Sequence, residues 1–398
     1  MTESNQSNSP TWVPFAYGFR PFFLLAGLYA VVSIAAWIWV WRTGSWPLQQ
    51  LPPQYWHGHE MIFGFIAAAM AGFLLTAVPS WTGSRGFEGT QLIVLTVLWV
   101  AGRIAFSLGE TLPVMVLSAI ELAFIPMLGA MLAPALLRSG NRNWPMLVLL
   151  ALFWAADSAF LHGVGAGDPL ISRTAMLAAM NIVLILITII GGRIVPAFTR
   201  NALRARGIEV SLHSPPVIER LVMLSMLAML LCDLFLPGSA ITAATVAFAA
   251  MLHLWRLASW HGWQTRGQPI VWVLHLAYLW LPVGLGLKAA WLAGGFGWAA
   301  HWLHALGAGA AGLMILAVMT RAALGHTGRP LQVRGSIAAA YSLLALSVVV
   351  RVLGPLIVPF DYPAIVLAAA ILWIAAFLLF LAVYTPILLR PRVDGKRG

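Results

Sequence analysis

Charged residues are scarce in this chain of 398 residues, of which 9% are charged and 61% are hydrophobic. In soluble globular proteins roughly a quarter of the residues are charged, so the composition excludes that class. Apolar runs recur along the whole length, and each exceeds the roughly 18 residues that a helix needs to cross a bilayer. The sequence therefore predicts an all-α protein with many membrane spans, whose first partner is the lipid bilayer.

Cysteine is almost absent, since Cys232 is the only one. One thiol excludes an internal disulfide, a cysteine-ligated iron–sulfur cluster and the C-x-x-C-H attachment of a c-type haem. Any haem would be held by histidine or methionine. The phosphate-binding motif G-x-x-x-x-G-K-[ST] is also absent, which excludes ATP-driven pumping.

Acidic residues are few, with 12 against 23 basic residues and a formal net charge of +11. The basic residues lie in the connections between apolar runs, as topology signals do, so we expect no nucleic-acid partner. If the N-terminus is cytoplasmic, 18 of the 23 basic residues fall on the cytoplasmic side. This bias predicts that both termini are cytoplasmic. The five exceptions are Arg42, Arg103, Arg173, Lys288 and Arg351.

The apolar runs predict twelve transmembrane helices. They lie near residues 21–41, 56–80, 90–108, 112–137, 144–164, 171–199, 216–236, 238–261, 269–293, 298–322, 335–357 and 362–389. Helices 3 and 4 are separated by residues 109–113, and helices 7 and 8 by residues 236–238, where glycine and proline stop a helix. The first run is too long for a signal-peptide core and lacks a cleavage site, which indicates a retained helix.

Domain organisation follows from these spans. Residues 1–20 would form a cytoplasmic segment, residues 21–389 a single twelve-helix transmembrane domain, and residues 390–398 a basic cytoplasmic tail. Similar stretches at 72–79 and 312–319, and a related end at 192–200, lie four helices apart. This repeat would divide the chain into three four-helix units.

The ten histidines separate into two layers on this topology. His57 and His59 begin helix 2, and His301 and His304 begin helix 10, all on the periplasmic side with His162. On the cytoplasmic side we place His253, His261, His275 and His326. For His162, His213 and His301 we expect hydrogen bonding or solvation rather than ligation, as is usual for a single histidine in a helix bundle.

Helical spacing decides which histidines share a ligand. His57 and His59 lie about 200° apart around a regular helix axis, so both cannot point at one metal. A haem held between two helices needs one imidazole from each helix at matching depth. His57 or His59 opposite His304 meets that requirement, and the spacing leaves open which of the two would bind iron.

Charged residues inside the spans usually face the bundle interior and pair with one another. Seven occur here, namely Glu60, Arg103, Glu121, Asp157, Asp233, Lys288 and Arg351. Most are expected to form ion pairs, with the acidic groups neutralising Arg103 and Lys288. Glu60, next to His59, would orient a ligand histidine or accept a proton as the catalytic carboxylate.

Several stretches together resemble the NnrS family of bacterial haem- and copper-containing membrane proteins. They are Gly18–Leu24, Trp56–Met61, Leu74–Gly83, Gly191–Arg193, Trp272–Tyr278 and Leu324–Pro330. The resemblance implies an inner-membrane protein of nitric oxide metabolism or nitrosative-stress resistance, alongside denitrification. It also implies haem, here a b-type haem, and copper.

A looser similarity joins His57, Gly58, Met61 and Phe63 to the second helix of haem–copper oxidase catalytic subunits. There such a histidine ligates the low-spin haem with a partner on helix 10. The histidine pair of that family's helix 7 and its helix 6 copper histidine are absent here, so a copper site of that design is excluded.

We therefore expect a b-type haem between helices 2 and 10, with His57 or His59 and His304 as axial ligands. His275 and His326, with His253 or His261, would form a second metal or haem site on the cytoplasmic side. The small ligand would be nitric oxide, either bound or reduced, with a quinol or a redox protein as electron donor. Two alternatives stay open: a secondary transporter, for which twelve spans are ordinary, and an assembly factor that carries haem or copper without turnover.

Overall fold

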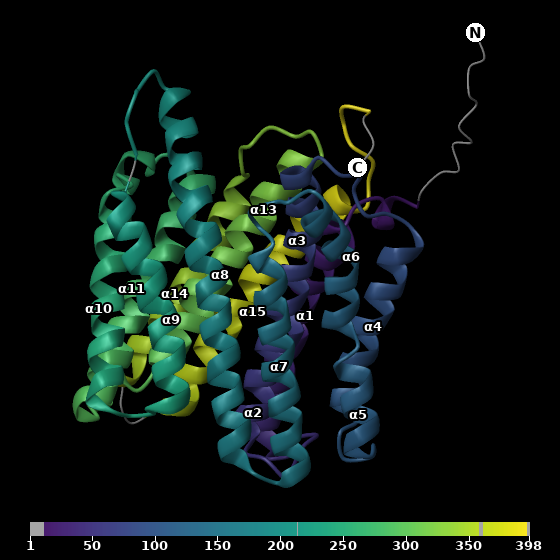
Figure 1. The fold of residues 1–398 in the computed structure, drawn as a ribbon, viewed down its shortest axis with the longest axis vertical. Helices are drawn as coiled ribbons and strands as arrows, with labels where there is room; N and C mark the ends of the chain where they lie inside the picture. Colours follow the sequence, from purple (N-terminus) through teal and green to yellow (C-terminus); the bar gives the residue numbers. More distant parts are fainter. Residues whose placement is uncertain (1–11, 213, 358–360, 396–398) are drawn as a thin grey trace.

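The chain folds as an assembly of helices, seen in a computed structural model that describes residues 12–212, 214–357 and 361–395 (Figure 1). The longer helices are α1 (Phe19–Thr43), α3 (Ala67–Thr82), α4 (Thr90–Ser107), α6 (Phe124–Arg138), α7 (Pro145–Ala166), α8 (Pro169–Arg204), α9 (Pro216–Phe235), α10 (Ala240–Ala258), α11 (Pro269–Gly294), α13 (Leu313–His326), α14 (Gly335–Ile357) and α15 (Tyr362–Leu388). Short segments extend or join them: η1 (Val13–Phe15), α2 (Pro53–His59), η2 (Glu60–Ile66), α5 (Val114–Glu121), η3 (Gly262–Thr265), η4 (Gly297–Ala299), α12 (Trp302–His304) and η5 (Ala305–Gly312).

Eleven of these helical stretches are long and apolar enough to cross a membrane, which fits a multi-pass protein in a lipid bilayer. α9 is the helix that falls short among the twelve predicted from the sequence. It has 20 residues and packs between α8 and α10, but it carries Glu219, Arg220 and Asp233. Twelve spans therefore stay a prediction, whereas an all-helical membrane architecture is confirmed.

The predicted helix breaks occur at glycine and proline. α4 ends at Ser107 and α5 begins at Val114, while α9 ends at Phe235 and α10 begins at Ala240. Helix 4 contains a further break that the hydrophobic pattern does not reveal, because α5 ends at Glu121 and α6 starts at Phe124. The predicted segments 1–20 and 390–398 lie partly outside the described residues.

The two described ends of the chain lie at the same face of the bundle (Figure 1). Arg20, at the start of α1, donates hydrogen bonds to the carbonyls of Leu388 and Arg390 at 2.7 and 2.8 Å. α1 also packs along α15. This arrangement agrees with an even number of membrane crossings; which side the ends occupy stays a prediction.

Four spans form the centre of the molecule. The buried share is 83% for Pro53–Thr82, 72% for α8, and 67% for both α11 and Gly297–His326, against 44% or less in the other seven. Buried helices of this kind position polar side chains away from lipid. They include the spans predicted as helices 2, 6 and 10, but the three four-helix units stay a prediction.

The second and tenth predicted helices share an irregularity that the sequence pattern did not predict. η2 and η5 are both π-helical, and each begins directly after a histidine, His59 or His304. A π-helical segment inserts extra residues into a helix and is frequently found at functional sites. Both helices are therefore distorted just where their histidines stand.

Candidate functional site

His57 and His304 line one cavity of about 390 Å³ between the central helices. Its wall is mainly apolar and includes Ile62, Phe65 and Trp373. Small-molecule and cofactor sites are typically apolar cavities of roughly 300–1,000 Å³ with a few polar groups. The structure therefore brings one histidine of helix 2 and one of helix 10 to the same candidate binding site.

The His57 imidazole is held by stacking. Its ring centroid lies 4.6 Å from that of Trp37 on α1, with an angle of 24° between the planes. Its buried Nδ1 has no hydrogen-bond partner among the described residues. Buried polar atoms nearly always have a partner, so a bound ligand would supply the partner that this imidazole lacks.

Two arginines add positive charge to the same cavity, Arg173 of α8 and Arg351 of α14. Arg351 donates to Nδ1 of His301 at 3.1 Å and to the Tyr362 hydroxyl at 2.8 Å. Guanidinium groups form strong hydrogen bonds with carboxylates. A mainly apolar cavity with two arginines suits a flat apolar ligand that carries acidic substituents.

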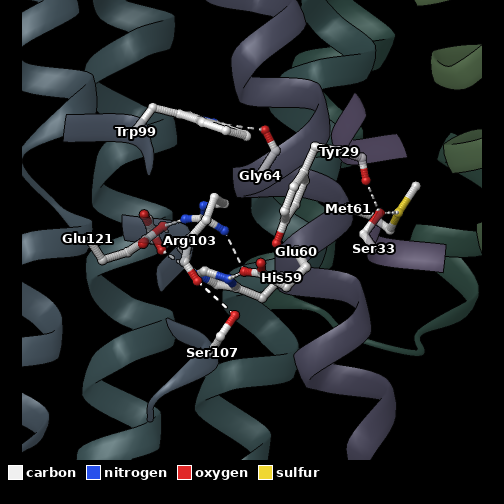
Figure 2. A network of polar contacts seen from close by, with 11 residues as sticks. Tyr29, Ser33, His59, Glu60, Met61, Gly64, Trp99, Arg103, Ser107 and Glu121 are labelled. Carbon is white, nitrogen blue, oxygen red and sulfur yellow. Dashed lines mark hydrogen bonds and ion pairs between the residues drawn. The ribbon is translucent and has the colours of Figure 1, made fainter. Parts of the chain in front are cut away.

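His59 lies elsewhere, in a fully buried polar cluster with Glu60, Arg103 and Glu121 (Figure 2). Asp157 belongs to the same cluster. Nδ1 of His59 is 3.1 Å from Oε1 of Glu60, and its Nε2 is 3.1 Å from Oδ1 of Asp157. Nε2 is also 3.9 Å from Oε1 of Glu121. The Phe106 ring stacks on the imidazole with centroids 3.8 Å apart. His57 and His59 thus serve different surroundings.

Arg103 of α4 ties the acidic groups of this cluster together. Its guanidinium is ion-paired with both Glu60 and Glu121. Figure 2 shows Arg103 between these two carboxylates, which come from η2 and α5. The change to π-helix at Glu60 and the helix break after Glu121 both fall at the cluster, in keeping with the rule that irregular backbone at membrane depth is buried in protein or lines a cavity.

The expected ion pairs of the spans are confirmed for two of the three interior cations, Arg103 and Lys288, whereas Arg351 donates to His301 and Tyr362. Arg103 pairs as described, and Lys288 of α11 pairs with Asp233 of α9. The Asn181 amide also donates to Asp233 at 2.7 Å. Asp233 on α9 therefore binds both Lys288 of α11 and Asn181 of α8. These contacts fix the C-terminal end of α9 against the central helices.

His253 and His275 pack against two aromatic residues that contact each other, His253 against Tyr278 and His275 against Trp260. His253 Nδ1 is 2.8 Å from the Tyr278 hydroxyl, and His275 Nε2 is 2.7 Å from Thr199 Oγ1. A Cβ added to Gly262 would stand 2.5 Å from His275 Nδ1, so the chain closes that side of the ring. Each histidine thus has one partnered ring nitrogen, whereas Nε2 of His253 and Nδ1 of His275 are buried and have no hydrogen-bond partner among the described residues.

The remaining candidates that the sequence analysis assigns to the cytoplasmic side lie in different surroundings. The His326 ring centroid is 5.9 Å from that of Tyr17 and 5.7 Å from that of Phe19. His261 has a left-handed backbone with φ of 51° and lies beside Trp263. No contact joins His326 to His275 in the part of the chain that the structure describes. His213, expected to be solvated, lies outside the described residues.

Sequence reasoning missed two features of the site. It did not single out Asp157 as the partner of His59, because the two residues are 98 positions apart. It noted Arg173 only as an exception to the charge bias and Arg351 also as an interior charge, and it assigned neither to the cavity of His57 and His304. The departure of both arginines from the positive-inside bias could have indicated the site, because a basic residue on the other side of the membrane is not explained by topology.

One comparison with known proteins gives a match. The family model described as NnrS protein matches residues 13–392, nearly the whole chain. No protein with a curated description matches the chain.

Proposed function

We propose, from the premise that the chain belongs to the NnrS family, that it is a haem-containing inner-membrane protein that acts on nitric oxide. The haem would occupy the cavity shared by His57 and His304, and these two imidazoles would hold its iron, with one of them giving way where nitric oxide binds. The observation that carries the proposal is that one histidine from each of two separate helices lines the same mainly apolar cavity.

The residues present fit a b-type haem. The cavity is mainly apolar, as a macrocycle requires, and two arginines are available for its carboxylates. Glycine stands beside each ligand region: a Cβ at Gly58 would lie 2.7 Å from Met176 Sδ, and one at Gly307 would lie 3.4 Å from Met180 Cε. A larger residue at Gly58 would displace the Met176 side chain, which also lines the cavity, whereas a Cβ at Gly307 would make an ordinary van der Waals contact with Met180.

The bound haem would supply an iron that binds nitric oxide and exchanges electrons. The protein's own residues hold and shield it. Trp37 fixes the plane of the His57 ring by stacking. Arg351 keeps His301 in a neutral form, since Nδ1 of that ring accepts its hydrogen bond. Glu60 is committed to His59 and Arg103, so we propose that it acts at the neighbouring cluster and not directly at the haem.

A gaseous substrate also fits the interior of the protein. Ile66 lines both the 390 Å³ cavity and a second, almost wholly apolar cavity of about 80 Å³ between α3, α8 and α13. Met314 and Ala311 line the second cavity. An apolar diatomic molecule enters such spaces readily, whereas ions and polar solutes do not.

Copper and the second, cytoplasmic-side site stay predictions. Copper is implied by the resemblance, and the residues His275 and His326 with His253 or His261 stay candidate ligands at the cytoplasmic end. The electron donor would be a quinol or a redox protein. The cytoplasmic location of the termini and the bacterial inner membrane belong to the same proposal.

An absorption spectrum of the protein purified in detergent tests the proposal. We expect a Soret band with stoichiometric iron and a spectral change on anaerobic addition of nitric oxide. Consumption of nitric oxide with a reductant would identify an enzyme, and binding without consumption would identify a carrier or sensor. A protein without a Soret band and without iron would contradict the haem and favour a secondary transporter.

A further inference from the structure

The buried cluster around His59 contains a set of donor atoms that converge on one point. Nε2 of His59, a carboxylate oxygen of Glu121 and one of Asp157 all lie within 4.8 Å of one another. Two ligand atoms of a tetrahedral zinc ion stand roughly 3.3 Å apart, given metal–ligand distances of about 2.0–2.1 Å. The distances of 3.1 and 3.9 Å from Nε2 to the two carboxylates bracket that spacing.

Acidic groups outnumber basic groups in this cluster. Arg103 offsets one of the three carboxyl groups of Glu60, Glu121 and Asp157. All five side chains are buried, with exposed fractions between 0% and 7%. Buried ionisable groups are paired, coordinate a metal or take up a proton. A divalent cation would replace the protons of the two remaining carboxyl groups and keep the cluster neutral.

Two buried carboxylate oxygens without a hydrogen-bond partner in the described part of the chain, and a small cavity, lie in the same cluster as the three donor atoms. Oε2 of Glu121 and Oε2 of Glu60 are buried and have no hydrogen-bond partner among the described residues. A small cavity of about 10 Å³ lies beside two of the donors, Glu121 and Asp157, and is lined also by Arg103 and apolar side chains, whereas His59 is not among its lining residues. The volume of the cavity is close to the volume that one water-sized particle requires.

The environment of His59 also matches a metal-bound imidazole. A neutral imidazole has one donor and one acceptor nitrogen, yet both nitrogens of His59 face carboxylates. With a cation bound at Nε2, Nδ1–H donates to Glu60. A ligand histidine usually donates its other ring nitrogen to a carboxylate in this way. Glu60 then pairs with Arg103, which anchors it.

We propose that His59 Nε2, Asp157 and Glu121 bind a divalent cation of the class that accepts mixed imidazole and carboxylate ligands, such as Zn²⁺ or Cu²⁺. Glu60 is the positioning residue for His59, and Arg103 supplies the remaining positive charge. The site is distinct from the cavity of His57 and His304 and does not rest on a haem being bound there.

Metal analysis of the detergent-purified full-length protein tests this site. After chelator treatment, the protein is dialysed against Zn²⁺ or Cu²⁺, and retained metal is measured per chain. We expect one equivalent in the parent protein and a loss of about tenfold or more in affinity for Asp157→Asn and His59→Ala, as removal of a metal-site residue commonly gives. Ser158→Ala, next to Asp157 but on the exposed side of α7, is the matched control and should keep the metal.

A spectroscopic signature separates ligation from a structural role. Cu²⁺ at this site should show nitrogen coupling from a single imidazole in its electron paramagnetic resonance spectrum, and the coupling should vanish in His59→Ala. Glu60→Gln should keep the nitrogen signal but weaken binding. His57→Ala should lose any Soret band yet keep this metal, so failure of the haem proposal is distinguishable. Retention of less than stoichiometric metal by the parent protein, or full retention by Asp157→Asn, would overturn the site.

Discussion

The imidazole of His57 lies nearly parallel to the indole of Trp37, with ring centroids 4.6 Å apart. Since Trp37 belongs to α1 and His57 to α2, this stack fixes the His57 ring against the cavity that it shares with His304. His59, two residues later, stacks instead on Phe106 of α4. The neighbouring helices thus divide the two histidines between two sites.

Removal of His57 or His304 should abolish haem binding. Each substitution by alanine would delete one axial bond, and we expect haem occupancy to fall on the order of tenfold or more, as happens even when an outer partner of a metal site is lost. The Soret absorbance per milligram of purified protein measures the effect. His59→Ala is the internal comparison and should retain the Soret band.

The same three variants also test the opposite assignment of His57 and His59. If His59→Ala loses the Soret band while His57→Ala keeps it, the assignment of the two histidines is reversed. Near-native helical circular dichroism in all three variants is required before the comparison is made.

Arg351 should contribute to haem affinity through its charge. A charge-assisted hydrogen bond is worth about 1.5–3 kcal/mol, so Arg351→Gln should weaken haem retention by roughly tenfold or more. Haem transfer to an apo-haem acceptor protein gives the dissociation rate. Tyr362→Phe removes one Arg351 hydrogen bond without changing charge, and it should have the smaller effect. Equal effects of the two variants would point to loss of packing instead.

The hydrophobic pattern predicts the helices well because each span must bury its own backbone hydrogen bonds in lipid. It predicts the ion pairs of Arg103 and Lys288 for the same reason, since an unpaired charge in that environment is costly. Neither argument identifies partners far apart in sequence. Asp157 meets His59 only because α7 packs near η2, and that packing follows from side-chain shape, which a periodicity does not encode.

The division between His57 and His59 was only half predicted. Their spacing excludes a common target, but the direction of each ring depends on the π-helical segment that starts at Glu60. Such a segment changes the angle between successive side chains, and its sequence, Glu60–Ile66, looks like any apolar helix. The break after Glu121 is hidden likewise, because neither Leu122 nor Ala123 is a helix-breaking residue.

Breaking the buried pair of Lys288 and Asp233 should destabilise the protein. Lys288→Met would leave the Asp233 carboxylate with the Asn181 amide as a hydrogen-bond donor but without its cation, and loss of one partner of a buried pair costs about 3–5 kcal/mol. The midpoint of thermal unfolding in detergent should fall clearly. The double variant Lys288→Met with Asp233→Leu should recover most of the loss, and Arg85→Ala, in an exposed pair, should change little. An unchanged midpoint in Lys288→Met would show that the pair is not important for stability.

The position of α9 determines the number of spans. In a Cys232→Ser background, single cysteines are placed in exposed positions at Ser45, Ser84, Glu209 and Pro237. With twelve spans and cytoplasmic ends, Ser45→Cys and Pro237→Cys should react with a membrane-impermeant maleimide added outside spheroplasts, and Ser84→Cys and Glu209→Cys should react only after lysis. If the cysteines at 209 and 237 react from the same side, α9 does not cross the membrane.

We expect nitric oxide to reach the haem through the apolar interior of the protein. Ala311 lines the 80 Å³ cavity that adjoins the His57 and His304 cavity at Ile66. Ala311→Phe should fill that space, because protein interiors are close-packed and leave little volume for rearrangement. We expect the rate of nitric oxide binding, followed by stopped flow or flash photolysis, to fall several-fold while the resting spectrum stays the same. Ala178→Phe places the same bulk in a separate apolar cavity beside α7 and α9 and should leave the rate unchanged. Equal rates in Ala311→Phe and the parent protein would exclude this route, and the gas would then have to reach the haem from the end of the cavity at Arg173 and Arg351.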